Sequence, residues 1–260
     1  MRGYGVRAAL PAAALCAAIL AGASLWLGLA GAAVVSALLV ALGWIIYFHS
    51  ERNVLAALRA RPVSEVERPE LYRLVRELAF SAHLPVPRLF MSPAAQPNIL
   101  TIGYSARTAA VCCTEGLLRI LSPAELRAVL AHELAHVARR DFAVASWSAG
   151  LASLVAARPL IALLLHVTAP AGREYGADID GALLTGEPMA LASALQKVEA
   201  AALAQPLRPR GTLAAASHLM IVHPFPASGL GGMLSTHPPT SERVRRLEAL
   251  CGGPRLPAQR

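Results

Sequence analysis

The sequence predicts a mainly helical protein of the α+β class, in which an N-terminal transmembrane helical hairpin precedes a helical domain with a small β-sheet. Three observations support this prediction. Hydrophobic residues make up 55% of the 260 positions, which is high for a purely soluble domain. Positions 8 to 48 carry no charged residue. The rest of the chain combines segments of helical periodicity with three short runs that are typical of strands.

The uncharged run is too long for one membrane crossing. A single helix over positions 8 to 48 would extend for roughly 60 Å, about twice the thickness of the hydrocarbon core. Two spans, at about 8–27 and 29–48, fit instead, with a turn around Gly28. The alternative is a secretory signal peptide or a single anchor, but the apolar core of a signal covers only about 7–15 residues. We therefore assign residues 1–50 to a membrane hairpin.

Arginines indicate the orientation of this hairpin. Arg2 and Arg7 precede it, Arg52, Arg59 and Arg61 follow it, and the turn carries none. Because positively charged flanks stay on the inner side of a membrane, both ends should be cytoplasmic. The expected location is the cell membrane, in a multi-pass arrangement with the following domain facing the cytoplasm.

The formal net charge of +8 suits a surface beside anionic lipid or nucleic acid. The arginines are scattered along the chain, and no motif typical of nucleic-acid binding occurs. We therefore expect the lipid bilayer, and no nucleic acid, as a partner.

Residues 51–251 are expected to form one domain. Leucines and valines at helical spacing predict a helix over 69–83. Short apolar runs predict strands at 88–91, 97–103 and 109–114. The last residues, 252–260, are expected to form a disordered tail.

A second helix has several start signals that agree. Ser122 is its expected N-cap, Pro123 occupies the first helical position, and Glu125 completes a capping box. The helix is expected to run from Pro123 to about Asp141. Its second half contains the segment with the strongest chemical signal in the chain.

This segment is "VLAHELAHVARRD", residues 129–141. Residues four apart lie one above the other on a helix, so His132 and His136 can bind one metal ion from one face. Glu133 follows directly, which puts its carboxylate beside the ion, where it can take a proton from zinc-bound water. The alternative is a pair of solvated histidines on an amphipathic helix. A third ligand would favour the metal site.

A catalytic zinc of this kind has three protein ligands and an open position for water. Acidic residues are sparse downstream of the motif, and "REYGADIDGALLTG" (173–186) offers Glu174 and Asp178. On one helix face, Glu174 would bind the metal while Asp178 accepts the ring N–H of a ligand histidine. A surface salt bridge is the alternative role for Asp178.

The apolar stretch at 142–172 separates the second ligand from the third, and both must meet at one ion. The chain between them therefore crosses the bilayer an even number of times. Two spans with a turn need roughly 36 residues, more than this stretch contains. Arg158 and Pro159 at its middle predict an apolar hairpin of two short helices, which packs on the domain or dips into the cytoplasmic leaflet.

Together, "VLAHELAHVARRD" and "REYGAD" resemble the HtpX-type membrane zinc metallopeptidases, relatives of the CAAX prenyl endopeptidases. "PNILTIGYSARTAAVCCTEGLLRIL" is similar to the active-site strand region of that family, and "STHPPTSERVRRL" to its C-terminal motif. The resemblance covers roughly residues 60 to 250. It implies a gluzincin-type metallopeptidase domain, one Zn²⁺ per chain held by two histidines and a glutamate, and endopeptidase activity on membrane or misfolded proteins.

The expected reaction is metal-assisted hydrolysis of peptide bonds. Zinc acidifies its water and polarises the scissile carbonyl, while Glu133 moves the proton from the water to the leaving amine. His237 is a candidate donor to the oxyanion, or else it caps the helix that starts near Pro239. Asn98 is a candidate for aligning the substrate backbone along its strand.

Two further functions stay open from the sequence. A catalytically inactive membrane scaffold would keep zinc for stability, although a structural site closes its fourth position with a protein ligand and needs no base such as Glu133. A signalling protease would cleave a repressor instead of damaged proteins. Either protease function implies protein or peptide substrates as partners.

Overall fold

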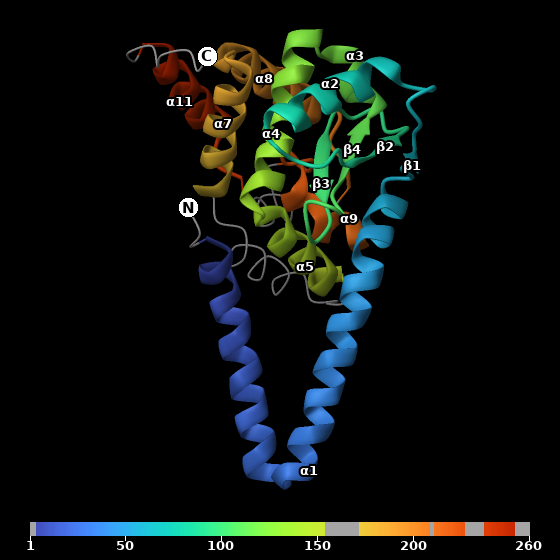
Figure 1. Ribbon diagram of the computed structural model, residues 1–260, viewed down its shortest axis with the longest axis vertical. Helices are drawn as coiled ribbons and strands as arrows, with labels where there is room; N and C mark the ends of the chain where they lie inside the picture. Colours follow the sequence, from blue (N-terminus) through green and yellow to red (C-terminus); the bar gives the residue numbers. More distant parts are fainter. Residues whose placement is uncertain (1–3, 154–171, 209–210, 227–236, 253–260) are drawn as a thin grey trace.

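The computed structural model of the protein describes residues 4–153, 172–208, 211–226 and 237–252. Helices surround a small sheet in a domain that is joined to one long, bent helix (Figure 1). The mainly helical α+β class predicted from the sequence is confirmed. The helical elements of the domain are α2 (Pro69–Ser81), α3 (Glu115–Ile120), α4 (Pro123–Arg139), α5 (Asp141–Ser153), α7 (Gly172–Thr185), α8 (Pro188–Ala204), α9 (Gly211–Ala216), the 3-10 turn η1 (Ser217–Leu219) and α11 (Thr240–Gly252).

The long helix α1 (Tyr4–Ala57) reverses direction at Gly28. This residue has φ 68° and ψ −170°, a conformation that side chains disfavour, so the turn requires glycine. Figure 1 shows two arms that diverge from the turn, and the second arm leads into the domain. Residues Ala17–Ala57 are long and apolar enough to cross a membrane. That both arms cross it, at 8–27 and 29–48, stays a prediction.

The second arm of α1 presents apolar side chains to its surroundings. Its exposed large hydrophobic residues are Leu29, Val34, Leu38, Val40, Trp44, Ile45 and Phe48. A continuous apolar surface of this kind is stable in lipid, because in water it would have to be hydrated.

The sheet has four strands in the order β1-β2-β4-β3. β1 (Arg61–Pro62) and β2 (Arg88–Ser92) are antiparallel, β2 and β4 (Ala110–Thr114) are parallel, and β3 (Ile99–Ile102) is antiparallel to β4. The three predicted strands are confirmed, whereas β1 is too short to leave a periodic signal in the sequence. β3 is an edge strand of this sheet and packs against α4, the helix that carries both histidines.

Helix α4 begins as predicted. The Ser122 hydroxyl accepts a hydrogen bond from the Glu125 N–H, and the Glu125 carboxylate accepts one from the Ser122 N–H. The second half of α4 is buried among its neighbours, which include α7, α8 and β3. Arg140 ends the helix in a left-handed conformation, and α5 starts directly afterwards at Asp141.

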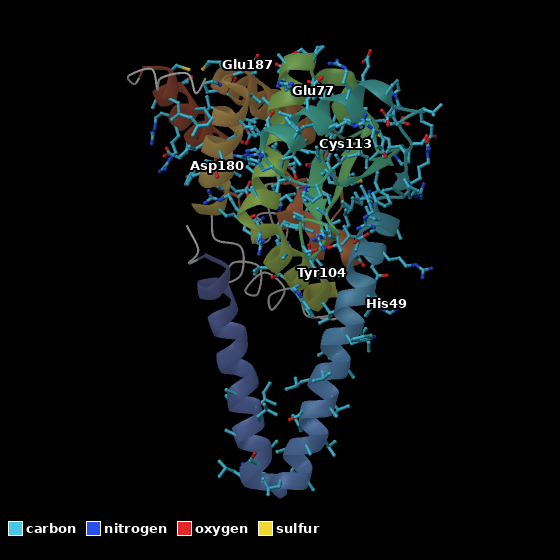
Figure 2. The ribbon with its side chains drawn as sticks, viewed as in Figure 1. His49, Glu77, Tyr104, Cys113, Asp180 and Glu187 are labelled. Carbon is cyan, nitrogen blue, oxygen red and sulfur yellow. The ribbon has the colours of Figure 1, made fainter. Side chains whose placement is uncertain are left out.

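Helix α5 joins the domain to α1. Gly150 lies so close to the second arm that a Cβ there would be 2.6 Å from Cγ2 of Ile46. Across the same contact, the Ser50 hydroxyl donates to the Ser146 carbonyl at 2.9 Å. Small residues let helix backbones approach closely in this way. Figure 2 shows Tyr104 at the same end of the domain, where its hydroxyl donates to the Ile46 carbonyl.

Two predictions fall wholly or partly outside the described residues. The apolar stretch at 142–172 is described only as far as Ser153, within α5, so the turn predicted at Arg158 and Pro159 lies outside. Residues 253–260 of the expected tail also lie outside. Its first residue, Gly252, is instead the last residue of α11.

Candidate metal centre

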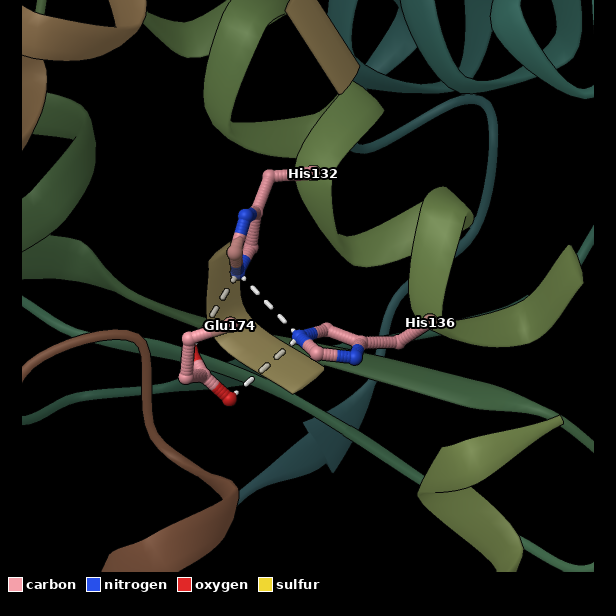
Figure 3. A group of neighbouring side chains, drawn as sticks. All are labelled: His132, His136 and Glu174. Atoms are coloured by element: carbon pink, nitrogen blue, oxygen red, sulfur yellow. Dashed lines mark hydrogen bonds and ion pairs between the residues drawn. The ribbon is translucent and has the colours of Figure 1, made fainter. Parts of the chain in front are cut away.

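The three predicted ligands meet in the interior of the domain (Figure 3). His132 and His136 come from one face of α4, and Glu174 comes from the first turn of α7. One nitrogen of each ring and one carboxylate oxygen lie within 4.8 Å of one another, and all three residues are buried. Two imidazoles and a carboxylate make up a donor set typical of catalytic zinc.

Two glycines allow α7 to pack closely against α4. A Cβ at Gly181 would be 2.8 Å from the backbone nitrogen of His132. A Cβ at Gly176 would be 2.4 Å from Nη2 of Arg139. Because the backbone at the first contact cannot yield locally, a larger residue would push α7 outward. The glycines thereby set the distance at which Glu174 faces the histidines.

Each histidine is held through its other ring nitrogen by an aspartate. Asp178 Oδ1 lies 3.0 Å from Nδ1 of His132, and Asp141 Oδ1 lies 2.8 Å from Nδ1 of His136. Because an ionised carboxylate only accepts, each aspartate favours a proton on Nδ1, and a neutral ring in this tautomer offers its Nε2 lone pair. The two Nε2 atoms are 3.2 Å apart, and each lies 3.7 Å from a Glu174 oxygen. Converging lone pairs repel without a cation among them, so these residues fit a metal ion.

The electrostatics of the cluster also favour a positive charge at its centre. Burial opposes the charged imidazolium, but Asp141 and then Glu174 raise the pKa of His136 to about 9. Burial likewise opposes the Glu174 carboxylate, yet His237 and His136 hold its pKa well below the usual value. The acidic groups therefore stabilise a cation between the ligands, whether a proton or a metal ion.

Asp178 has a second partner in α11. Arg243 is 1% exposed and donates to both carboxylate oxygens of Asp178, at 2.7 and 2.8 Å. Burial opposes ionisation of Asp178, but Arg243 outweighs it and the pKa falls to about 2. The ion pair between Asp178 and Arg243 is therefore buried and lies next to His132. It is not the surface salt bridge that the sequence left open as an alternative for Asp178.

Glu133 lies beside the ligands and faces the sheet. Its Oε2 accepts a hydrogen bond from the Thr101 hydroxyl of β3 at 2.6 Å. Next to it is a cavity of about 10 Å³, lined by Thr101, Glu133, His136, Phe142, Ala145, Arg173 and Leu219. A cavity of this size holds about one water molecule. The Glu133 carboxylate is therefore within reach of a water beside His136, a predicted ligand.

His237 reaches the same cluster from the segment before α11. Its Nδ1 lies 3.5 Å from Oε2 of Glu174, and its side chain is buried. The start of α11 is held by the Pro239 carbonyl, which accepts from the N–H groups of Glu242 and Arg243. The structure thus brings His237 to a predicted metal ligand.

Comparison with known proteins places this chain in a family. The model of peptidase family M48 matches residues 65–251, well over half of the chain. The chain belongs to peptidase family M48. It is 44% identical to a protease HtpX homolog of Kineococcus radiotolerans, over 79% of this chain and 81% of that protein. It is 41% identical to one of Arthrobacter sp. (80% and 81%) and 38% identical to one of Syntrophobacter fumaroxidans (78% and 84%).

Membership of family M48 makes the protein a peptidase, and the apolar helix α1 associates this M48 peptidase with a membrane. The resemblance to HtpX-type enzymes predicted from the sequence is confirmed. The His132, His136 and Glu174 cluster is consistent with the metal chemistry of such enzymes.

Asn98 lies apart from the ligands of the M48 centre. Its side-chain amide donates to the Val222 carbonyl at 3.0 Å, and its Oδ1 accepts from the Ile99 N–H at 3.1 Å. The Asn98 side chain therefore binds the backbone of its own chain. A role in aligning the substrate stays a prediction.

Four residues of this centre were not predicted from the sequence, namely Thr101, Asp141, Arg173 and Arg243. The Arg173 guanidinium donates to Glu174 Oε1 at 3.0 Å and to the His218 carbonyl. Asp141 left a usable signal, because it is an acidic residue that follows His136 closely in the same motif. Thr101 and Arg243 carry no spacing signal, since their partners lie on different elements.

Proposed function

We propose that this protein is a zinc-dependent endopeptidase of the cell membrane that cleaves membrane or misfolded proteins, as in HtpX-like quality control. One Zn²⁺ per chain would be held by His132, His136 and Glu174. The observation that carries the proposal is the convergence of these three donors, two of them backed by aspartates, beside a carboxylate that has no part in the ligand set. A structural zinc site has no use for such a carboxylate.

A zinc ion in this position supplies a Lewis acid that polarises the scissile carbonyl and acidifies water. Glu133 accepts the proton of the attacking water on its carboxylate and passes it to the leaving amine. Thr101 orients this carboxylate through its hydrogen bond to Oε2. Asp178 and Asp141 hold the two imidazoles in the tautomer that leaves Nε2 free for the metal.

His237 completes the proposed machinery as the donor to the developing oxyanion. Its ring lies next to Glu174, so a carbonyl oxygen at the metal would come within its reach. The His237→Ala variant should therefore lose turnover by about 10²-fold or more, the cost typical of one missing oxyanion donor. Zinc content and the melting temperature should stay near those of the wild type. A loss of thermal stability with little change in turnover would instead indicate a structural role at the start of α11.

Glu133→Gln tests the mechanism, because it removes the base and keeps the size of the side chain. We expect near-stoichiometric zinc by elemental analysis of the purified full-length protein, and cleavage of casein or a membrane protein reduced by 10²-fold or more. Glu115→Gln is the matched control, since Glu115 lies on the surface and pairs with Arg119.

Each alternative function has its own outcome in this experiment. Zinc bound by a wild-type protein that cleaves neither substrate would indicate an inactive scaffold. Cleavage restricted to one regulatory protein would indicate a signalling protease. Cleavage by Glu133→Gln at the wild-type rate would show that the assignment of the base is wrong.

A further inference from the structure

The outer edge of β3 is covered by the chain itself. The segment Ser217–Val222, here called the strap, lies alongside this strand. Leu100 and Met220 form an antiparallel bridge, and the Ile221 N–H donates to the Ile99 carbonyl at 3.0 Å. An edge strand with free backbone groups binds extended peptides by adding a strand. The strap occupies this position beside the metal centre.

Side chains around the metal centre hold the carbonyls of the strap. Arg173 donates to the carbonyl of His218, and Arg243 donates to that of Ile221 at 2.8 Å. These two arginines also contact Glu174 and Asp178, respectively. The Asn98 amide binds the Val222 carbonyl in the same way. The backbone carbonyls of any extended peptide could accept these three hydrogen bonds in place of the strap carbonyls.

The strap also borders the space beside the metal centre. Leu219 is buried and lines the cavity of about 10 Å³ that adjoins Glu133 and His136. The His218 ring is fully buried against α5, where it meets the Ala145 carbonyl at 3.0 Å. A cavity of this size holds about one water molecule and is too small for a peptide. Ile221 and Val222 of the strap line a second, larger cavity of about 320 Å³ together with His237 and Arg243.

We propose that the strap is an autoinhibitory mimic of the substrate. It lies on β3 where a substrate peptide binds and must leave this strand before cleavage. The proposal rests on the peptidase function proposed above and extends it to regulation and to the class of substrate. An extended, unfolded segment with apolar side chains at the places of Leu219 and Met220 fits the vacated strand position.

A reversible crosslink between strap and strand tests this proposal. Leu100 and Met220 are paired, and both side chains lie in the same buried cluster. Antiparallel partners have Cα atoms about 4.5–5.5 Å apart, within the range of a disulfide. Leu100→Cys and Met220→Cys are combined with Cys112→Ala, because Cys112 lies opposite Leu100 on β4 and would compete.

Oxidation of this triple variant should reduce casein cleavage by at least about tenfold, and dithiothreitol should restore it. Zinc content should be the same in both states. Each single cysteine variant in the Cys112→Ala background is the control, and oxidation should leave its rate unchanged. Cleavage by the fully crosslinked protein at the rate of its reduced form would show that the strap is a permanent strand, and the proposal would be wrong.

A second variant weakens the strap. Ile221→Pro removes the N–H that donates to Ile99, so cleavage should become several-fold faster than in the wild type. A synthetic peptide that copies Ala216–His223, "ASHLMIVH", should inhibit this variant, whereas a scrambled peptide should not. Equal inhibition by both peptides would contradict the mimicry.

The two proposals can fail separately. If neither the zinc-loaded wild type nor zinc-loaded Ile221→Pro cleaves a substrate, the proposed function fails, and binding of a peptide hydroxamate to the triple variant then tests the strap. Binding to the reduced form alone would support the strap as a cover of the metal centre. Equal binding to both forms would overturn it.

Discussion

Asp141 and Asp178 occupy similar places beside the two histidines, but their surroundings differ. Asp141 contacts His136 and lies at the first position of α5. Asp178 contacts His132 and also forms a buried, two-pronged ion pair with Arg243. The same substitution at the two positions should therefore have different effects.

Asp141→Asn should weaken zinc binding by about 10–100-fold, because it removes the charge behind His136. The loss of stability should be small, since the other charge near Asp141, Arg139 at 3.7 Å, is paired more closely with Asp180. Competition with a chelator measures the affinity, and the melting temperature of the metal-free protein measures the stability. Asp178→Asn should weaken zinc binding as well and also cost a few kcal/mol, since the buried Arg243 would lose its two-pronged partner and keep only the more distant Glu174 carboxylate, at 3.8 Å. Asp180→Asn is the control, because Asp180 pairs with Arg139 and not with a histidine. Equal losses of stability in Asp141→Asn and Asp178→Asn would contradict the different roles given to the two aspartates.

One methyl group added at Gly181 should push α7 away from α4. At Gly181 it would lie 2.8 Å from the backbone nitrogen of His132, so Gly181→Ala must displace the helix that carries Glu174. We expect a lower melting temperature and weaker zinc binding in a chelator titration. Gly172→Ala on the same helix has no neighbour within 4 Å of the new Cβ and should change neither quantity. Wild-type zinc affinity in Gly181→Ala would mean that the packing distance does not set the ligand geometry.

At the scale of elements, Glu125 joins the start of α4 to α8. Its carboxylate accepts from Ser193 at 2.6 Å and from Lys197 at 2.8 Å, in addition to the capping box. Burial opposes the charged form, but Lys197 and then Ser193 outweigh it and lower the pKa of Glu125 to about 2. A carboxyl whose pKa falls on folding stabilises the protein above its unfolded pKa and loses this contribution as the pH falls toward 2.

Glu125→Gln should therefore lower the free energy of unfolding of the metal-free protein by about 2 kcal/mol near neutral pH. This figure is smaller than the pKa shift alone would give, because Lys197 is half exposed and water screens its charge. The difference from the wild type should shrink between about pH 4.5 and pH 2. Denaturant unfolding in detergent at several pH values measures it. Glu115→Gln, on the surface, is the control and should show a much smaller difference. A difference that stays constant with pH would exclude the ionised carboxylate as its cause.

At the scale of the whole molecule, the length of the second arm of α1 sets the level of the bilayer. From Gly28 to Phe48 a helix rises by about 30 Å, which is the thickness of the hydrocarbon core. The ring centroids of Trp44 and Phe48 lie 4.7 Å apart at the end of this arm, with the ring planes tilted by 43°. Nearby, the ring centroids of Tyr104 and Trp147 of α5 lie 5.6 Å apart. Aromatic side chains concentrate at the membrane interface. We therefore expect the end of the domain that contains α5 to lie among the lipid headgroups.

The hairpin topology predicts labelling from opposite sides of the membrane. Trp26, beside the turn, is 89% exposed, and Val66 in the domain is 92% exposed. With Cys16→Ser and Cys251→Ser as background, Trp26→Cys should react with an impermeant thiol reagent outside intact cells. Val66→Cys should react only after the cells are permeabilised. External labelling of Val66→Cys would place the domain on the other side, whereas a Trp26→Cys that reacts only after permeabilisation would contradict the crossing.

The sequence by itself determined the features that depend on near neighbours. The capping residues start α4 at Pro123, and the spacing of His132 and His136 puts both rings on one face because a helix repeats every 3.6 residues. An uncharged run longer than one bilayer thickness requires a turn, and Gly28 supplies it. Glu174 could be named as a ligand because few acidic residues follow the motif.

Only the tertiary structure decided which distant groups meet. Arg243 pairs with Asp178 across helices, and Thr101 of β3 orients a glutamate of α4. The strap likewise covers a strand more than 100 positions earlier in the chain. No local period encodes such pairs, because a buried charge binds whichever partner the packing of helices brings within reach. The candidate ligands could therefore be named from the sequence, whereas the groups beside them and the segment along β3 emerged only when α4, α7, α11 and the sheet were packed together.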